Sequence, residues 1–215
     1  ILTRWMIARR SISAATAKQY EVGGTENGEL ITTRTGSYSY DDYGNLKTSS
    51  ETSTDNDSGS PYDGDSWTTS VTNTPDVDTS TWCLRLLSES QVSYSASSGS
   101  SVLRTRDYSP DLTNCRYEEI ITEPSSSSYE VTEQLGYDSF GNIDSDTVTG
   151  ISMAARASSA NWGTTGQFPM SVTDASGATT HFNYNFSYGL VSSETDHNGL
   201  RTAWVYGEGI GRVTQ

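Results

Sequence analysis

The last 42 residues of the chain carry one sequence pattern twice, and this repeat limits the possible folds more than any other feature. Six identities recur at a spacing of 22 residues: they pair Asp174 with Asp196, Gly177 with Gly199, Thr180 with Thr202, Tyr184 with Tyr206, Gly189 with Gly211 and Val191 with Val213. Phe182 and Trp204 keep an aromatic side chain in the same register. Internal repeats of this length are typical of solenoids and of arrays of β-hairpins.

Local chemistry predicts the structure of each repeat. Asp-x-x-Gly is typical of a turn, because Asp bonds to its own downstream backbone and Gly accepts a positive φ. The run after it alternates, and this places Thr180, Phe182 and Tyr184 on one face of a strand. Gly189 then turns the chain into a short returning strand. The step of five residues from each Tyr to its Gly predicts a bulge or a longer second turn.

Bulk properties favour a thin all-β protein. The hydrophobic fraction is 33%, below the roughly 45–50% of ordinary globular domains, so a thick core is not expected. The aromatic fraction of 10% argues against disorder. A net charge of −14 makes nucleic acid and anionic membrane surfaces poor partners. The sequence has no apolar run of membrane-spanning length, so no membrane span is predicted.

The sequence predicts three regions in one continuous architecture. Residues 1–35 are expected to form leading strands, with a hairpin at Asn27-Gly28 and a basic opening stretch read as a solvated strand. Residues 36–173 follow, with a long acidic loop over 47–66, a turn at Ser109-Pro110-Asp111 and a weak one-turn helix candidate within 151–160. The tandem repeats occupy 174–215 and stop within a unit, so we expect a piece of a longer protein.

A second motif occurs at two places outside the tandem repeats. It consists of Tyr40, Asp41, Gly44 and Asn45, and again of Tyr137, Asp138, Gly141 and Asn142. The tyrosines fit a ladder that stabilises one face of a sheet, whereas the Asp and Gly residues fit turns. The alternative is that Tyr40, Tyr137, Tyr184 and Tyr206 are platforms for stacking sugars.

Candidate sites for chemistry are few. Cys83 and Cys115 lie in strand-like runs and could form a disulfide or stay as free thiols; the acidic, Ser/Thr-rich composition favours the bridge. His181 and His197 occupy different settings, a strand and a turn, so neither is predicted to be catalytic or a zinc ligand. Asp55 and Asp57 only superficially match a calcium loop. We therefore predict no catalytic residues, no metal and no cofactor.

The Tyr-Asp-x-x-Gly-Asn motifs and the tandem units resemble the RHS/YD-repeat family over about residues 36–215. The order of Trp82-Cys83, Cys115, the second motif and Gly166 to Pro169 resembles its large bacterial members. The resemblance implies antiparallel hairpin repeats in a spiralling open sheet that forms a shell around a toxin domain. The implied partners are the remainder of the same polypeptide and the enclosed toxin domain, with self-association through sheet edges, in a secreted or bacterial cell-surface protein.

Two other classes of function remain open at this stage. An all-β surface adhesin or carbohydrate-binding module would expose coplanar aromatic side chains in a groove. A secreted glycan-cleaving enzyme would need a pair of carboxyl groups across a pocket, one with a raised pKa. The sequence does not place such a pair, and we expect a structural rather than an enzymatic role.

Overall fold

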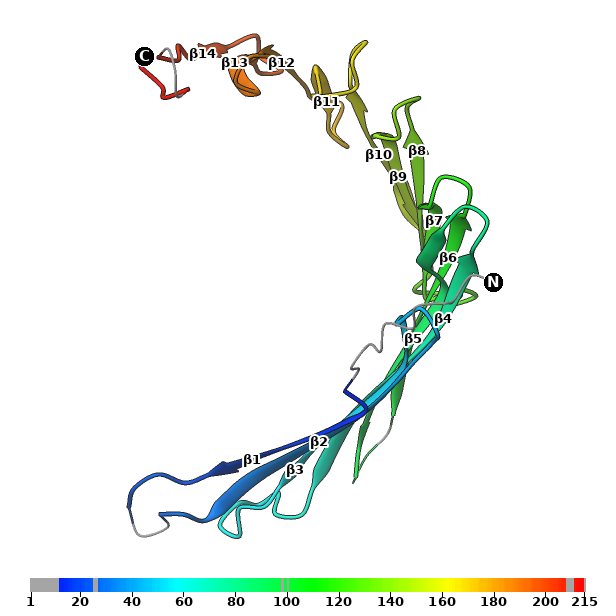
Figure 1. Cartoon of the computed structure of the whole chain (residues 1–215), viewed down its shortest axis with the longest axis vertical. Helices are drawn as coiled ribbons and strands as arrows, with labels where there is room; N and C mark the ends of the chain where they lie inside the picture. Colours follow the sequence, from blue (N-terminus) through cyan, green and yellow to red (C-terminus); the bar gives the residue numbers. More distant parts are fainter. Residues whose placement is uncertain (1–11, 25–26, 98, 100, 208–210, 215) are drawn as a thin grey trace, which may run out of the picture. The chain divides into compact units, whose positions relative to one another are not determined.

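A computed structural model describes residues 12–24, 27–97, 99, 101–207 and 211–214 (Figure 1). The predicted basic opening stretch lies outside these residues. The described residues form fourteen β-strands and no helix: β1 (Ala14–Tyr20), β2 (Leu30–Tyr40), β3 (Leu46–Asp55), β4 (Ser66–Asp78), β5 (Cys83–Ala96), β6 (Val102–Asp111), β7 (Arg116–Thr122), β8 (Val131–Tyr137), β9 (Ile143–Gly150), β10 (Met153–Asn161), β11 (Ser171–Thr173), β12 (Thr179–Asn185), β13 (Leu190–Thr195) and β14 (Arg201–Ala203).

The strands follow one another in a single sheet, in which the spatial order from β1 to β14 is the order of the sequence. Every pairing whose register is defined is antiparallel, from β1 with β2 to β13 with β14. The prediction of an all-β fold of antiparallel hairpins in one open sheet is therefore confirmed. No stretch of the described chain is a helix with the length and apolarity needed to cross a membrane.

The contacts between residues divide the chain into two compact units. The first contains Ile1–Arg116 and Thr122–Pro124, and the second contains Tyr117–Ile121 and Ser125–Gln215. The first unit holds the longest strands, including β4 and β5 with 13 and 14 residues. The second unit holds the shorter strands of the tandem repeats.

Hydroxyl side chains cover one face of the sheet in the first unit. Along one row of paired residues, Thr35 faces Thr52, Thr52 faces Thr68 and Thr68 faces Ser95. The Thr52 and Thr68 hydroxyl oxygens lie 2.8 Å apart, within hydrogen-bond distance. Cross-strand pairs of this kind stabilise a sheet without an apolar partner.

The predicted acidic loop over 47–66 is wrong for most of its length, because β3 continues to Asp55 and β4 begins at Ser66. The physical reason is the hydroxyl pairing described above, which lets a polar segment act as a strand. Only the connection between the two strands is a loop, and there the Asp55 carboxylate accepts bonds from the Asp57 backbone N–H and the Ser60 hydroxyl.

Two smaller predictions are also wrong. The weak helix candidate within 151–160 is largely strand β10, which begins at Met153 and pairs with β9. Ser109 and Pro110 continue strand β6, and the turn follows Asp111 instead. Pro is tolerated in a strand where its missing N–H breaks no ladder bond.

The sheet is a single layer with almost no buried interior. Among the described residues, Cys83 and Leu86 are the only buried apolar side chains, with exposed fractions of 0% and 8%, and Ser193 is the only buried polar one. Most other strand residues are half-buried, because each is covered by its neighbours in the sheet and not by a second layer. The low hydrophobic fraction of the sequence is explained by this arrangement.

Candidate functional site

The four repeat turns share one hydrogen-bonding pattern. In each, one Asp carboxylate oxygen accepts the backbone N–H of the residue four positions later, which is Asn45, Asn142, Ala178 or Leu200. The backbone N–H of the motif glycine donates to the carbonyl oxygen of the same Asp. All four glycines have a φ between 82° and 88°, and these are Gly44, Gly141, Gly177 and Gly199. An L-residue with a side chain adopts such a φ only at a cost.

The asparagines of the first two motifs attach these turns to distant parts of the chain. The Asn45 amide donates to the Asp41 carboxylate and to the carbonyl oxygen of Leu84, both at 2.6 Å. The Asn142 amide donates to the Asp138 carboxylate at 3.1 Å and to the carbonyl oxygen of Gly166 at 2.8 Å. The tandem repeats carry Ala178 and Leu200 at this position and have no equivalent side-chain bond.

The tyrosines of three repeats donate their hydroxyl groups to backbone carbonyl oxygens. Tyr137 bonds to Tyr117 at 2.5 Å and Tyr184 bonds to Pro169 at 2.9 Å. Tyr206 bonds to Val191, which is the residue equivalent to Pro169 one repeat later. Tyr40 is half-buried at the end of β2, in the same position relative to its turn. These contacts are those of a structural side chain, and burial raises the pKa of the Tyr184 hydroxyl.

A register shift in the sheet precedes the repeat tyrosines. It lies between Ser39 and Tyr40, between Gly136 and Tyr137 and between Asn183 and Tyr184. The bulge predicted for the first tandem repeat is therefore confirmed. The sequence analysis did not predict the two bulges before Tyr40 and Tyr137. For the second tandem repeat, Tyr206 and Val213 form an isolated bridge, so the predicted bulge there stays a prediction.

The second glycines of the tandem repeats close the returning turns. Gly189 and Gly211 have φ values of 66° and 63°. The Gly189 N–H donates to the carbonyl oxygen of Asn185 at 2.9 Å.

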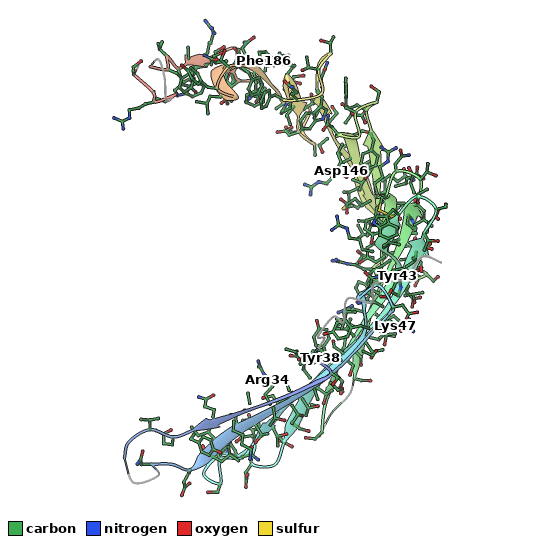
Figure 2. The ribbon with its side chains drawn as sticks, viewed as in Figure 1. Arg34, Tyr38, Tyr43, Lys47, Asp146 and Phe186 are labelled. Carbon is green, nitrogen blue, oxygen red and sulfur yellow. A yellow bond between two sulfur atoms is a disulfide. The ribbon has the colours of Figure 1, made fainter. Side chains whose placement is uncertain are left out.

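Three aromatic side chains lie together near this turn. The Phe168 and Tyr184 rings stack with centroids 4.7 Å apart, and the centroid of the exposed Phe186 ring, labelled in Figure 2, lies 5.9 Å from that of Phe168. The first tandem repeat and Phe168 thus form a small aromatic cluster where a thicker protein would have a core.

Hydrogen bonds lower the pKa of the carboxyl groups in these turns. At Asp41 and Asp138 partial burial opposes the shift, but bonds from Asn45 and Asn142 and from turn N–H groups outweigh it, so the pKa of each is lowered. For Asp174, bonds from Ser176 lower the pKa, and for Asp196 the Leu200 N–H does so. Each bond favours the ionised carboxylate.

We expect acid to destabilise the sheet through these turns. Because the folded-state pKa lies below the unfolded value of about 3.9, the stabilisation is complete above that pH and is lost as the pH falls through the folded values. The free energy of unfolding, measured by urea titration, should stay level from about pH 7 to 5 and fall below about pH 4. Asp138→Asn should make the fall shallower. A fall that disappears in high salt would instead point to long-range charge effects.

Cys83 and Cys115 form a disulfide with an S–S distance of 2.16 Å and a Cα–Cα distance of 5.2 Å. Cys83 is the first residue of β5, and Cys115 directly precedes β7. The bridge therefore joins the ends of two hairpin connections within the first unit. Beside it the Thr81 hydroxyl donates to the carbonyl oxygen of Leu112 at 2.8 Å, and Arg116 forms an ion pair with Asp111 at 3.3 Å.

One hollow in the described part of the chain brings titratable side chains together. His181, His197 and Asp196 line one shallow hollow of about 700 Å³, so the fold brings together two histidines that the sequence places in different settings. Within the described ranges, no group of three or more His, Cys, Asp or Glu side chains could hold a metal ion.

The fold defines an all-β protein built as one open sheet of successive hairpins. It is similar to part of a chain in the crystal structure of TcdB2-TccC3-Cdc42, with a TM-score of 0.60 and 8% sequence identity over 93% of this chain. It is also similar to part of the crystal structure of TcdB2-TccC3, with a TM-score of 0.56 and 9% identity over 90% of this chain. The chain spans 15% of the length of each matched chain. No protein-family model and no curated protein matches the sequence.

Proposed function

We propose that this chain is a non-enzymatic segment of an RHS/YD-repeat shell that encloses a toxin domain. The observation that carries the proposal is the single open sheet of successive hairpins, whose fold is similar to TcdB2-TccC3 over nine-tenths of the chain. The repeat motifs support it independently of the comparison, because their Asp and Gly residues build turns and three of their tyrosines bind backbone carbonyl groups.

A single-layer sheet is suited to be a wall. The described part of the first unit buries only Cys83 and Leu86 among its apolar side chains, so it lacks the interior around which an enzyme builds a catalytic pocket. A sheet in which each strand pairs with its neighbours in sequence can also be lengthened by further hairpins at either end, as in other repeat proteins. The chain would supply one stretch of such a wall.

The partners of this segment, on this proposal, are the rest of its own polypeptide and the enclosed toxin domain. Among the described residues β1 and β14 are the first and last strands of the sheet, and their outer edges are where further strands, or other copies of the chain, would add by backbone hydrogen bonding. The disulfide between Cys83 and Cys115 supports an oxidising compartment and thus a secreted or bacterial cell-surface protein.

The test is protease protection of the full-length polypeptide that carries this segment, combined with single-particle imaging. A shell should appear as a hollow particle with density inside, and one fragment should resist proteinase K until a denaturant opens the particle. The matched control is the same polypeptide digested after denaturation. If the segment folds into a closed sandwich, or if every fragment is cut as fast as in the control, the proposal is wrong.

A further inference from the structure

A hollow of about 380 Å³ lies on one face of the first unit, where β5 and β6 pair. In the sheet register Ser90 faces Arg106 and Val92 faces Arg104, so these four side chains share one face. The complete lining is Ser90, Val92, Tyr94, Arg104, Thr105, Arg106, Tyr108, Thr122 and Glu123. The hollow belongs to none of the repeat turns, although β5 and β6 are strands of the sheet that forms the proposed wall.

The hollow is positively charged in a chain whose net charge is −14. Arg104 and Arg106 both line it. Arg104 forms an ion pair with Glu123 at 3.6 Å, a distance longer than a hydrogen bond, which leaves most of its guanidinium donors available. No described carboxylate lies within ion-pair distance of Arg106. A guanidinium group can bind a carboxylate through two parallel N–H···O hydrogen bonds. Two guanidinium groups at one hollow therefore favour a ligand that carries a carboxylate.

The remaining lining residues indicate what carries the carboxylate. Tyr94 is 50% exposed beside Arg104, and the Tyr108 ring follows Arg106 along the same strand face. Two tyrosine rings offer flat apolar surfaces to a ring-shaped ligand. Ser90 and Thr122 add hydroxyl groups, which can donate to or accept from the hydroxyls of a sugar. A carboxylate on an acidic peptide would need no such flat surfaces.

We propose that this hollow binds a sugar that carries a carboxylate, of the uronic-acid or sialic-acid type. Arg106 and Arg104 bind the carboxylate, and Tyr94 and Tyr108 pack against the sugar ring. Glu123 competes with the ligand for Arg104. The site does not depend on the shell, since a wall segment and an adhesin could both carry it.

Equilibrium binding of defined oligosaccharides to the 215-residue chain tests the proposal, provided that its oxidised form shows the β-sheet circular dichroism of a folded protein. The probes are tetragalacturonate, an alginate tetramer, a hyaluronan tetramer and sialyllactose, with cellotetraose and lactose as neutral controls. At least one acidic sugar should bind about tenfold more tightly than every neutral one. Equal binding of neutral sugars, no binding of any sugar, or equally tight binding of tetraglutamate as an acidic peptide would each overturn the proposal.

Three variants make the test specific to the hollow. Arg106→Ala should weaken binding of the acidic sugar about tenfold or more. Glu123→Gln should strengthen it several-fold, because it removes the competing carboxylate. Arg34→Ala is the matched control: Arg34 is an exposed arginine on β2 (Figure 2), away from the hollow, and its loss should leave affinity unchanged. Equal weakening by Arg34→Ala and Arg106→Ala would mean that only overall charge matters, and the assignment of the hollow would fail.

Discussion

Replacing Cys83 and Cys115 together by alanine is expected to lower the free energy of unfolding of the first unit by about 3–4 kcal/mol. The bridge closes a loop with a sequence separation of 32 residues, and opening it returns conformational entropy to the unfolded chain. The effect should be large here because the described part of this unit buries only Cys83 and Leu86 among its apolar side chains. The disulfide thus supplies a constraint that a core supplies in thicker proteins.

Hydrogen exchange is the right measurement, because a chain with two compact units need not unfold in one step. Amides of β5 and β6 should exchange faster in the double variant, whereas amides of the tandem repeats in the second unit should be unaffected. The unmodified protein kept in a reducing agent is the matched control and should behave like the variant. Unchanged protection in β5 and β6 would show that the bridge adds no stability.

The turns of the repeats could be predicted from sequence because their chemistry is local. Asp174 bonds to backbone N–H groups of Ser176 and Ala178, all within five residues, so the residue types alone specify the turn. The alternation from Thr180 to Tyr184 likewise specifies a strand whatever its partner. The all-β fold followed from these elements and from the composition.

The strand at Leu46–Asp55 could not be predicted, because its stability depends on its neighbours. A run of Ser and Thr has the composition of a loop, and it becomes a strand only when hydroxyl groups such as those of Thr52 and Thr68 face each other in register. Register across a sheet is a property of two segments, and one segment considered alone does not contain it.

The long-range bonds of the motif asparagines were missed for the same reason. Asn45 bonds to Leu84, 39 residues away, and Asn142 bonds to Gly166, 24 residues away. The signal in the sequence was the recurrence of Asn directly after the motif glycine. This recurrence indicates that the Asn side chain has a role, but it does not identify the residue that the side chain contacts. The hollow beside Arg104 and Arg106 was missed as well, although the Arg-x-Arg-x-Tyr spacing places those side chains on one face.

The carbonyl oxygen of Gly166 accepts the bond from Asn142. We expect a methyl group added at Gly166 to lower the stability of the second unit strongly. Gly166 has a φ of 64°, which costs an alanine roughly 1–2 kcal/mol. A Cβ atom there would also lie 2.3 Å from Cγ and 2.8 Å from Cβ of Phe140, the aromatic residue of the Tyr-Asp motif. The Phe140 ring is exposed and can rotate, but its Cβ is fixed to the backbone. Relief therefore requires the loop to move, which disturbs the bond between Asn142 and the Gly166 carbonyl oxygen.

Gly166→Ala is therefore expected to destabilise the second unit by about 2–4 kcal/mol, the sum of backbone strain and overpacking. The measurement is urea unfolding together with hydrogen exchange of β8 and β9. Gly177→Ala is the matched control, since its φ is 85° but no atom lies within 4 Å of the added Cβ, and it should lose only the roughly 1–2 kcal/mol of backbone strain. In a Phe140→Ala background the cost of Gly166→Ala should fall only partly toward that of the control, because the ring is removed but the Cβ of residue 140 stays in place. If Gly166→Ala and Gly177→Ala lower the free energy of unfolding equally in the otherwise unaltered protein, the contact between the motif turn and the Gly166 loop contributes nothing to stability.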